Sequence, residues 1–150
     1  MRSHDLAQFN VAEPVAPVDS PALVDFANAL DRINALAEQA PGFVWRCVED
    51  AREAQGARPF GNNIIATLST WESMELLSAF VYRSDHVAYL RRRKEWFKPM
   101  SSANMVLWWV PHQHQPEFSE AVERLEHLRI NGPSAYAFTF ADRFAAPQPA

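Results

Sequence analysis

The sequence predicts an α+β fold with an antiparallel sheet in the split βαβ order of ferredoxin-like proteins. Two observations lead to this prediction. Segments with the patterning of strands lie at residues 6–12, 43–48, 63–71 and 104–110, and helical periodicity lies between them in the order β-α-β-β-α-β. The chain also has single-domain size, with 150 residues of which 48% are hydrophobic and 21% charged. We therefore treat residues 1–150 as one domain, with a structured core at about residues 6–141 and a tail at 142–150.

The first predicted strand has one apolar face and one more polar face. In residues 6–12 (LAQFNVA), apolar side chains alternate with Gln8 and Asn10, which is the period of two expected in a strand. Three prolines in residues 11–21 then indicate a loop. Helical spacing of apolar residues continues to residue 40, with Asp19 or Ser20 as the N-cap and Pro41-Gly42 as the stop.

The middle of the chain predicts two strands followed by two helices. Residues 43–48 (FVWRCV) and 63–71 (NIIATLSTW) have strand patterning, and the polar residues 49–63 between them predict a hairpin loop. The helices are expected from Glu72 to about Tyr82 and from Ser84 to about Phe97. Ser84 is the expected N-cap of the second helix.

The C-terminal part extends the split βαβ pattern. After the apolar strand at 104–110, residues 116–133 predict a helix that ends at Asn131-Gly132. Alternation in residues 135–140 (AYAFTF) predicts a last short strand. Helices on one face of a four-stranded sheet leave the other face to be covered, and face-to-face dimerisation is one way of covering it.

Charge and composition exclude several classes of protein. The chain has 14 basic and 18 acidic residues and a net charge of -4, which argues against a general nucleic-acid binder. Its single cysteine, Cys47, excludes an intrachain disulfide and is expected to be a buried structural thiol. No apolar run approaches the length of a membrane span, and the N-terminus lacks the apolar core of a signal peptide. We therefore expect a cytoplasmic protein with no membrane partner.

The sequence also lacks the motifs of nucleotide use and zinc hydrolysis. It has no Gly-rich phosphate loop, no G-x-S-x-G and no H-E-x-x-H. His112 and His114 are two residues apart in a loop, but no third metal ligand is near them in the sequence. A solvent-exposed loop is therefore favoured there, and no metal site is expected.

The segment at residues 71–97 contains the candidate catalytic residues. Tyr82, His86 and Arg93 recur at near-helical spacing and share one side of a helix. His86 is a candidate general base, Arg93 a candidate partner for a carboxylate or phenolate, and Tyr82 a candidate donor to an oxyanion. The alternative is structural: His86 packs beside the helix break, and the arginines are solvated or paired with Glu95 and Asp85.

The candidate substrate-binding residues are polar and aromatic. On the more polar face of the first strand, Asn10 and Gln8 either orient a carbonyl or hydroxyl group or form hydrogen bonds with neighbouring strands. Aromatic walls suit a flat hydrophobic ligand, although packing in the core is the alternative for each tryptophan. The aromatic candidates are Trp45, Trp71, Trp96 and Trp109.

Several phrases resemble a known superfamily. They are Ala40-Pro41-Gly42-Phe43, Trp71-Glu72-Ser73 followed by Phe80, and Ser84-Asp85-His86. They are similar to the corresponding segments of antibiotic-biosynthesis-monooxygenase-like domains, which are homodimeric α+β barrels with a pocket in each protomer. The longer phrases FVYRSDHVAYLRRRKEWF, LWWVP, LEHLRINGP and AFTF resemble a related bacterial family of unknown function, and the similarity extends over residues 6–141.

The resemblance implies a range of chemistries and allows one of them to be tested. Superfamily members oxidise polycyclic phenols without a cofactor, degrade haem, use haem in dehydration or dismutation, or cyclise and isomerise polyketides. The residues of the haem-degrading branch fall on Asn10, Phe80 and Leu90 here. Leu90 cannot bind iron, so haem degradation of that type is not expected, whereas His86, one helical turn away, leaves another haem geometry open.

Two functions are therefore expected from the sequence. The first is a small cofactor-independent enzyme that acts on a hydrophobic aromatic or polyketide-like molecule by oxygenation, cyclisation or isomerisation. The alternative is a non-catalytic homodimer that binds a hydrophobic ligand or haem.

Overall fold

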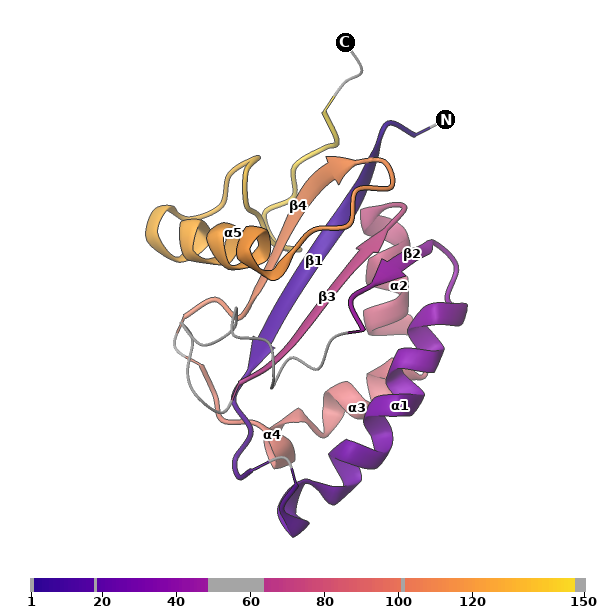
Figure 1. The fold of residues 1–150 in the computed structure, drawn as a ribbon, viewed down its shortest axis with the longest axis vertical. Helices are drawn as coiled ribbons and strands as arrows, with labels where there is room; N and C mark the ends of the chain where they lie inside the picture. The colour runs from indigo at the N-terminus through magenta and orange to yellow at the C-terminus, as the bar shows by residue number, and fades with distance from the viewer. Residues whose placement is uncertain (1, 18, 49–63, 101, 148–150) are drawn as a thin grey trace.

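The structure is a computed structural model that describes residues 2–17, 19–48, 64–100 and 102–147. Its sheet has the strands β1 (His4–Ala12), β2 (Phe43–Arg46), β3 (Ile65–Trp71) and β4 (Met105–Pro111). They form one antiparallel, open sheet in the order β2-β3-β1-β4 (Figure 1). The predicted α+β class and the four strand positions are confirmed. The hairpin loop predicted at 49–63 lies outside the described residues.

The helices follow the order expected from the sequence. They are the short 3-10 helix η1 (Pro21–Leu23), α1 (Val24–Gln39), α2 (Met74–Arg83), α3 (His86–Arg91), α4 (Arg93–Trp96) and α5 (Phe118–Asn131). Ser73 caps α2 because its side chain accepts a hydrogen bond of 3.2 Å from the Leu76 N–H. Gly132, with φ of 79°, ends α5, as the sequence predicts. None of these helices is long and apolar enough to cross a membrane.

The helix predicted from Ser84 to Phe97 is divided in the structure. Arg92, with φ of -91° and ψ of 2°, separates α3 from α4. Its guanidinium bonds Asp25 of α1 and Glu95, and it lies 4.6 Å from the Trp96 ring centroid. The contact with Asp25, which helical periodicity does not contain, accompanies the break. The predicted N-cap is also shifted, because Asp85 occupies that position while the Ser84 hydroxyl accepts a hydrogen bond from the His86 N–H.

The strand predicted at residues 135–140 is wrong. In this segment Phe138 pairs with Leu107 of β4 through two backbone hydrogen bonds of 2.8 and 2.9 Å. A turn closed by backbone hydrogen bonds between Ser134 and Ala137 precedes this bridge, and a turn in which the Asp142 N–H bonds the Thr139 side chain follows it, so no strand forms. The alternation of this segment reflects burial of Ala137 and Phe138 in two different clusters.

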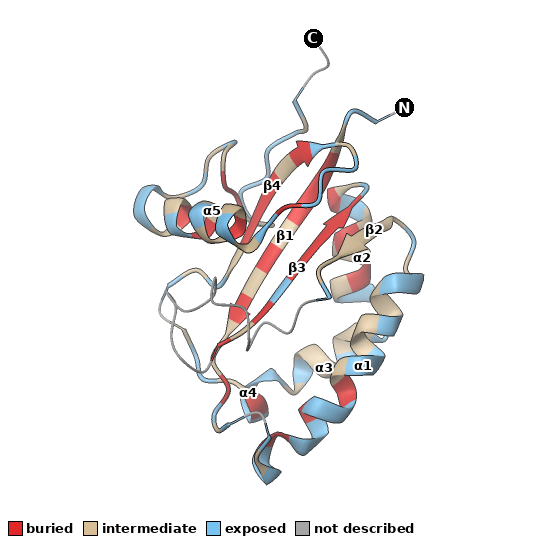
Figure 2. Ribbon diagram, in the orientation of Figure 1, coloured by how far each residue is buried: buried red, intermediate tan, exposed pale blue. Residues whose placement is uncertain are grey.

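Both faces of the sheet are packed by this chain. Ala7, Phe9 and Val11 of β1 belong to a cluster with the α5 residues Ala121 and Leu125, and we call this side the α5 face. Leu6 belongs to a cluster with α2 and Trp71, and we call that side the α2 face. The central strands are largely buried (Figure 2). The sequence predicted that this second face must be covered, with face-to-face dimerisation as one way, and α5 of the same chain packs on it.

A third cluster joins the remaining helices. Trp96 of α4 packs with Phe26 of α1, at a centroid distance of 5.4 Å, and Ile65 of β3 borders the cluster. These helices therefore lie on the same side of the sheet as α2, because Ile65 and Trp71 alternate onto the same face of β3.

Candidate functional site

Polar side chains form a strip across the middle of the α2 face. The register pairs Gln8 with Ser69 and Asn10 with Thr67, so these four residues share one face of β1 and β3. We call them the polar strip. Thr67 is exposed although β3 lies between two strands, and Gln8 and Asn10 are partly buried. Solvent therefore reaches this part of the sheet.

Ser69 is the centre of the hydrogen bonds in the polar strip. Its Oγ accepts a hydrogen bond of 2.8 Å from Gln8 Nε2 and one of 2.9 Å from Trp71 Nε1. Gln8 Nε2 also lies 3.5 Å from Thr67 Oγ1. We did not predict Ser69 or Thr67 as site residues. Alternation in residues 63–71 together with the register against β1 would have indicated both of them.

Among the four residues of the polar strip, Asn10 has an unusual environment. Its Oδ1 is buried and receives no hydrogen bond from any residue that the structure describes. A buried acceptor without a donor costs about 1–3 kcal/mol of stability. Such an atom calls for an explanation, and the usual ones are an ordered water, an ion or a donor from outside the described residues.

Aromatic rings connect the polar strip with His86. The Trp71 ring stacks on Phe80 at 5.2 Å, and the Phe80 ring lies 5.0 Å from the His86 ring. His86 Nδ1 lies 3.1 Å from the Val81 carbonyl oxygen, which can only accept, so Nδ1 carries the proton and Nε2 is the basic nitrogen. Burial lowers the pKa of the His86 imidazole below its ordinary value, and the hydrogen bond to Val81 opposes that shift only in part. His86 is therefore neutral at neutral pH.

The two other candidate catalytic residues lie at the surface. Tyr82 is 50% exposed, and its ring packs edge-on against Phe140 at 5.8 Å. Arg93 is exposed on α4. Among the described residues, no hydrogen bond or ring contact joins either of them to the polar strip or to His86.

The tryptophans are distributed over different parts of the molecule. Trp71 borders the polar strip, whereas Trp45 packs against the cluster of the α5 face. Trp96 is buried in the cluster with Phe26, and Trp109 donates a 2.8 Å hydrogen bond from Nε1 to the Phe144 carbonyl. The structure thus brings Gln8 and Trp71 together at Ser69, places Asn10 on the same face of the sheet, and links Trp71 to His86 through Phe80.

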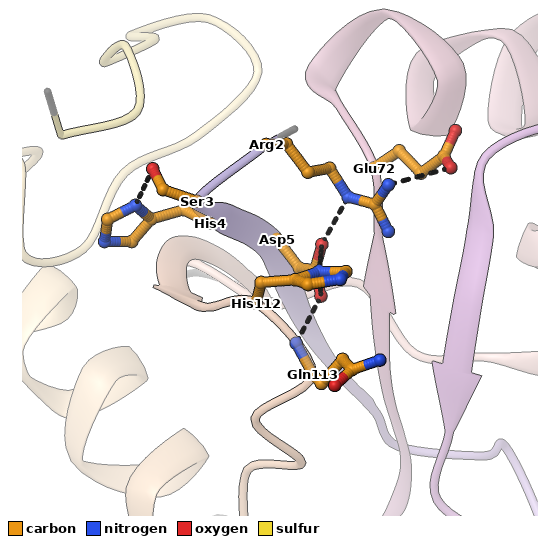
Figure 3. A network of polar contacts seen from close by, with 7 residues as sticks. All are labelled: Arg2, Ser3, His4, Asp5, Glu72, His112 and Gln113. Atoms are coloured by element: carbon orange, nitrogen blue, oxygen red, sulfur yellow. Dashed lines mark hydrogen bonds and ion pairs between the residues drawn. The ribbon is translucent and has the colours of Figure 1, made fainter. Parts of the chain in front are cut away.

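A second polar cluster surrounds Asp5 at the end of the sheet (Figure 3). The Asp5 carboxylate is fully buried and accepts hydrogen bonds from Arg2 Nε at 2.6 Å and from the Gln113 N–H at 2.9 Å. His112 Nδ1 lies 3.2 Å from each of its oxygens, and Arg2 also bonds Glu72 at 3.1 Å. The expected solvent-exposed loop at His112 is therefore tied to a buried carboxylate.

The protonation of Asp5 follows from these contacts. Burial alone would raise the pKa of the Asp5 carboxyl group, but the hydrogen bonds from Gln113, Arg2 and His112 outweigh it and hold the pKa below its ordinary value. Gln113 adopts φ of 70°, which is uncommon for a residue other than glycine, and its N–H bonds Asp5 in this conformation. All members of the cluster thus have partners, which indicates a structural joint between the N-terminus, the turn after β4 and the start of α2.

An open hollow of about 620 Å³ lies beside the turn after β4. Part of its charged lining is engaged in hydrogen bonds within the protein: His114 with Glu120 at 2.8 Å, and Glu123 with the Tyr136 hydroxyl at 2.8 Å. Arg124 donates to the Tyr136 carbonyl at 2.9 Å, although its buried Nε has no partner among the described residues. No group of three or more potential metal ligands occurs in the described parts of the chain. We take the polar strip as the candidate site because it also contains two of the substrate-binding residues expected from the sequence, Gln8 and Asn10, together with a buried acceptor that lacks a donor among the described residues.

The fold and this strip define a small α+β protein with an open antiparallel sheet and a polar site on its α2 face. The family described as "Domain of unknown function (DUF3291)" matches residues 5–150, and the chain belongs to this family. No curated protein matches the chain.

Two solved structures are similar in part. The NE2512 protein of unknown function from Nitrosomonas europaea has 17% identity and a TM-score of 0.47, over 78% of this chain and 97% of that chain. PA3566 from Pseudomonas aeruginosa has 13% identity and a TM-score of 0.45, over 76% of this chain and 98% of that chain.

Proposed function

We propose that the chain binds a small, uncharged and largely apolar molecule at the polar strip. The observation that carries this proposal is the buried Oδ1 of Asn10, which has no donor among the described residues. A hydroxyl or N–H group of a bound molecule would satisfy it, and binding would recover the cost of the unpaired acceptor. Small-molecule sites commonly combine apolar walls with a few placed polar groups.

The surroundings of the strip support this class of ligand. The four strip residues carry no charge, so they offer hydrogen bonds and no ion pair. Trp71 and Leu107, on the same face, are buried in the apolar cluster that borders the strip. Exposure of Thr67 gives access to the strip from solvent.

A titration followed by NMR tests the proposal. We expect 4-hydroxyacetophenone to shift the backbone amides of residues 8–10 and 67–71, with millimolar affinity for so small a probe. Amides of α5, which lies across the sheet, serve as the internal control and should not move. Absence of shifts at the strip up to the solubility of the probe contradicts the proposal.

A second function, acid/base catalysis without a cofactor, is favoured by His86. Its Nε2 is the basic nitrogen, and its pKa is lowered by burial. A tilted contact with Phe80, which stacks on Trp71, connects it with the strip. We propose that His86 removes a proton from a carbon next to a carbonyl of the bound molecule, which is the step shared by isomerisation, cyclisation and cofactor-free oxygenation. Tyr82 and Arg93 are exposed and have no role in this proposal.

Exchange of carbon-bound protons measures this step directly. In D2O, His86 Nε2 would remove a methyl proton of acetophenone and a deuteron from solvent would replace it, so no further reactant is needed. We expect the wild type to accelerate the exchange and His86→Gln to lose at least a hundredfold of that acceleration. Equal exchange rates for the two proteins would contradict the catalytic role and leave binding unaffected.

The finer architecture is also a proposal. The strand order β2-β3-β1-β4, with helices after β1 and β3, supports a ferredoxin-like arrangement related to antibiotic-biosynthesis-monooxygenase-like proteins. A homodimer would have to use a surface other than the part of the sheet that α5 packs against. Light scattering on the eluting protein distinguishes monomer from dimer, and a Soret absorption band would favour the haem-binding alternative.

A further inference from the structure

The hydrogen bonds within the polar strip leave one side chain to donate to a ligand and another to accept from it. From this arrangement we infer that the strip selects a ring-sized, uncharged molecule with a carbonyl acceptor on one side and a hydroxyl or N–H donor on the other. This inference rests on the proposed binding function. It names the chemistry of the ligand from two side chains, Ser69 and Asn10.

Ser69 must act as a donor toward a ligand. A hydroxyl group has one proton and two lone pairs. The Ser69 oxygen accepts from Gln8 Nε2 at 2.8 Å and from Trp71 Nε1 at 2.9 Å, which occupies both lone pairs. The indole of Trp71 can only donate. The described residues provide no acceptor for the Ser69 proton, so this proton is left for a carbonyl oxygen of the ligand.

Asn10 must act as an acceptor toward the same ligand. Its Oδ1 is buried and lacks a donor in the described part of the chain. Asn10 pairs with Thr67 in the register, and Ser69 is the next residue of β3 on the same face. The two side chains are thus diagonal neighbours on adjacent strands, whose Cα positions are about 7–8 Å apart. A single six-membered ring with substituents on opposite sides spans a separation of this order.

Three matched probes separate the two hydrogen bonds. 4-Hydroxyacetophenone carries both groups, acetophenone lacks the hydroxyl donor, and 4-methylphenol lacks the carbonyl acceptor. Each is titrated into the full chain, and Kd is obtained from the amide shifts of residues 8–10 and 67–71. We expect 4-hydroxyacetophenone to bind about five- to tenfold more tightly than either of the other probes, as one hydrogen bond predicts.

The variants assign each hydrogen bond to one side chain. Asn10→Leu should remove the preference over acetophenone but keep the preference over 4-methylphenol, and Ser69→Ala should do the reverse. Ser119→Ala on the exposed side of α5 and Asn28→Leu on the exposed side of α1 are the matched controls and should keep both preferences.

Ser69→Ala leaves the Gln8 and Trp71 donors without their acceptor. Because this loss can prevent folding, a second variant tests the same hydrogen bond. Gln8→Leu frees one lone pair of Ser69, which can then accept as well as donate. We expect it to weaken the preference over 4-methylphenol. Equal Kd values for the three probes with shifts at the strip would overturn the inference and leave the proposed function standing. No shift at the strip with any probe would overturn both.

Discussion

At the scale of single residues, the most informative side chain is Asn10. It has a buried acceptor without a partner on a strip that solvent partly reaches. Natural proteins retain such costly groups mainly where they serve a function. The sequence placed Asn10 on the more polar face of the first strand, but the absence of a donor depends on every side chain packed around it, and the local pattern does not contain that information.

Replacing Asn10 by Leu should stabilise the protein. Leu has nearly the same size, and it removes the unpaired oxygen, so we expect the free energy of unfolding to rise by about 1–3 kcal/mol. Urea unfolding measures this change, with Asn28→Leu on the exposed side of α1 as the control that should change it by less. A loss of stability in Asn10→Leu would mean that the amide has a partner and would weaken the ligand proposal.

His86 gives a prediction for pH. Because its pKa is lowered in the folded state by burial, the unfolded chain binds the proton more readily. The stability from neutral His86 is therefore present above about pH 6.5, the ordinary pKa, and is lost as pH falls through the lower pKa of the folded protein. We expect His86→Phe, which keeps a ring beside Phe80, to lose less stability than the wild type between pH 7.5 and pH 5. Parallel losses in the two proteins would show that the His86 pKa is not lowered.

At the scale of elements, the turn before β2 depends on one glycine. Gly42 has φ of 87°, and a Cβ placed on it would lie 2.5 Å from the Leu76 Cβ of α2. The Gly42 carbonyl also accepts a 2.7 Å hydrogen bond from the Glu72 N–H. Glycine is therefore required both for the backbone conformation and for the approach of α2 to this turn.

Two glycine substitutions separate these requirements. Gly132 has a similar φ of 79°, but nothing lies within 4 Å of a Cβ placed there. We expect Gly132→Ala to cost about 1 kcal/mol for the backbone alone, and Gly42→Ala to cost about 2–4 kcal/mol because α2 must also shift. Thermal unfolding of both variants measures the difference. Equal losses would show that Leu76 moves aside freely.

At the scale of the whole molecule, the Asp5 cluster joins segments that are distant in the sequence. Arg2 and His112 bind one buried carboxylate, and Arg2 also donates a hydrogen bond to Glu72 (Figure 3). Because the pKa of Asp5 is held low in the folded state, its contribution is present above the ordinary pKa of about 3.9 and is lost as pH falls through the lower value of the folded protein.

Replacing Asp5 by Asn should destabilise the whole chain. The amide keeps the shape but loses the charge that Arg2 faces and turns one acceptor into a donor, so we expect a loss of about 2–4 kcal/mol at pH 7. Unfolding measured from pH 7 to pH 3 should show a smaller loss with acid in Asp5→Asn than in the wild type. Glu123→Gln, at the exposed end of the hydrogen bond to Tyr136, is the control and should have a much smaller effect. An Asp5→Asn protein as stable as the wild type would contradict the role of the cluster.

The local pattern of the sequence determined the four strands of the sheet and the positions of the main helices, because period-two and period-3.6 burial act over a few neighbouring residues. It also placed Gln8 and Asn10 on one face of β1.

Only the tertiary structure decided that α5 packs on the second face, that Phe138 contributes a single bridge, and that Asp5 binds His112 across 107 positions. The tertiary structure also decided that Tyr82 and Arg93 lie at the surface while His86 packs beside Phe80. Alternation assigns side chains to two faces, but the register between strands and the packing of distant helices decide what each face meets.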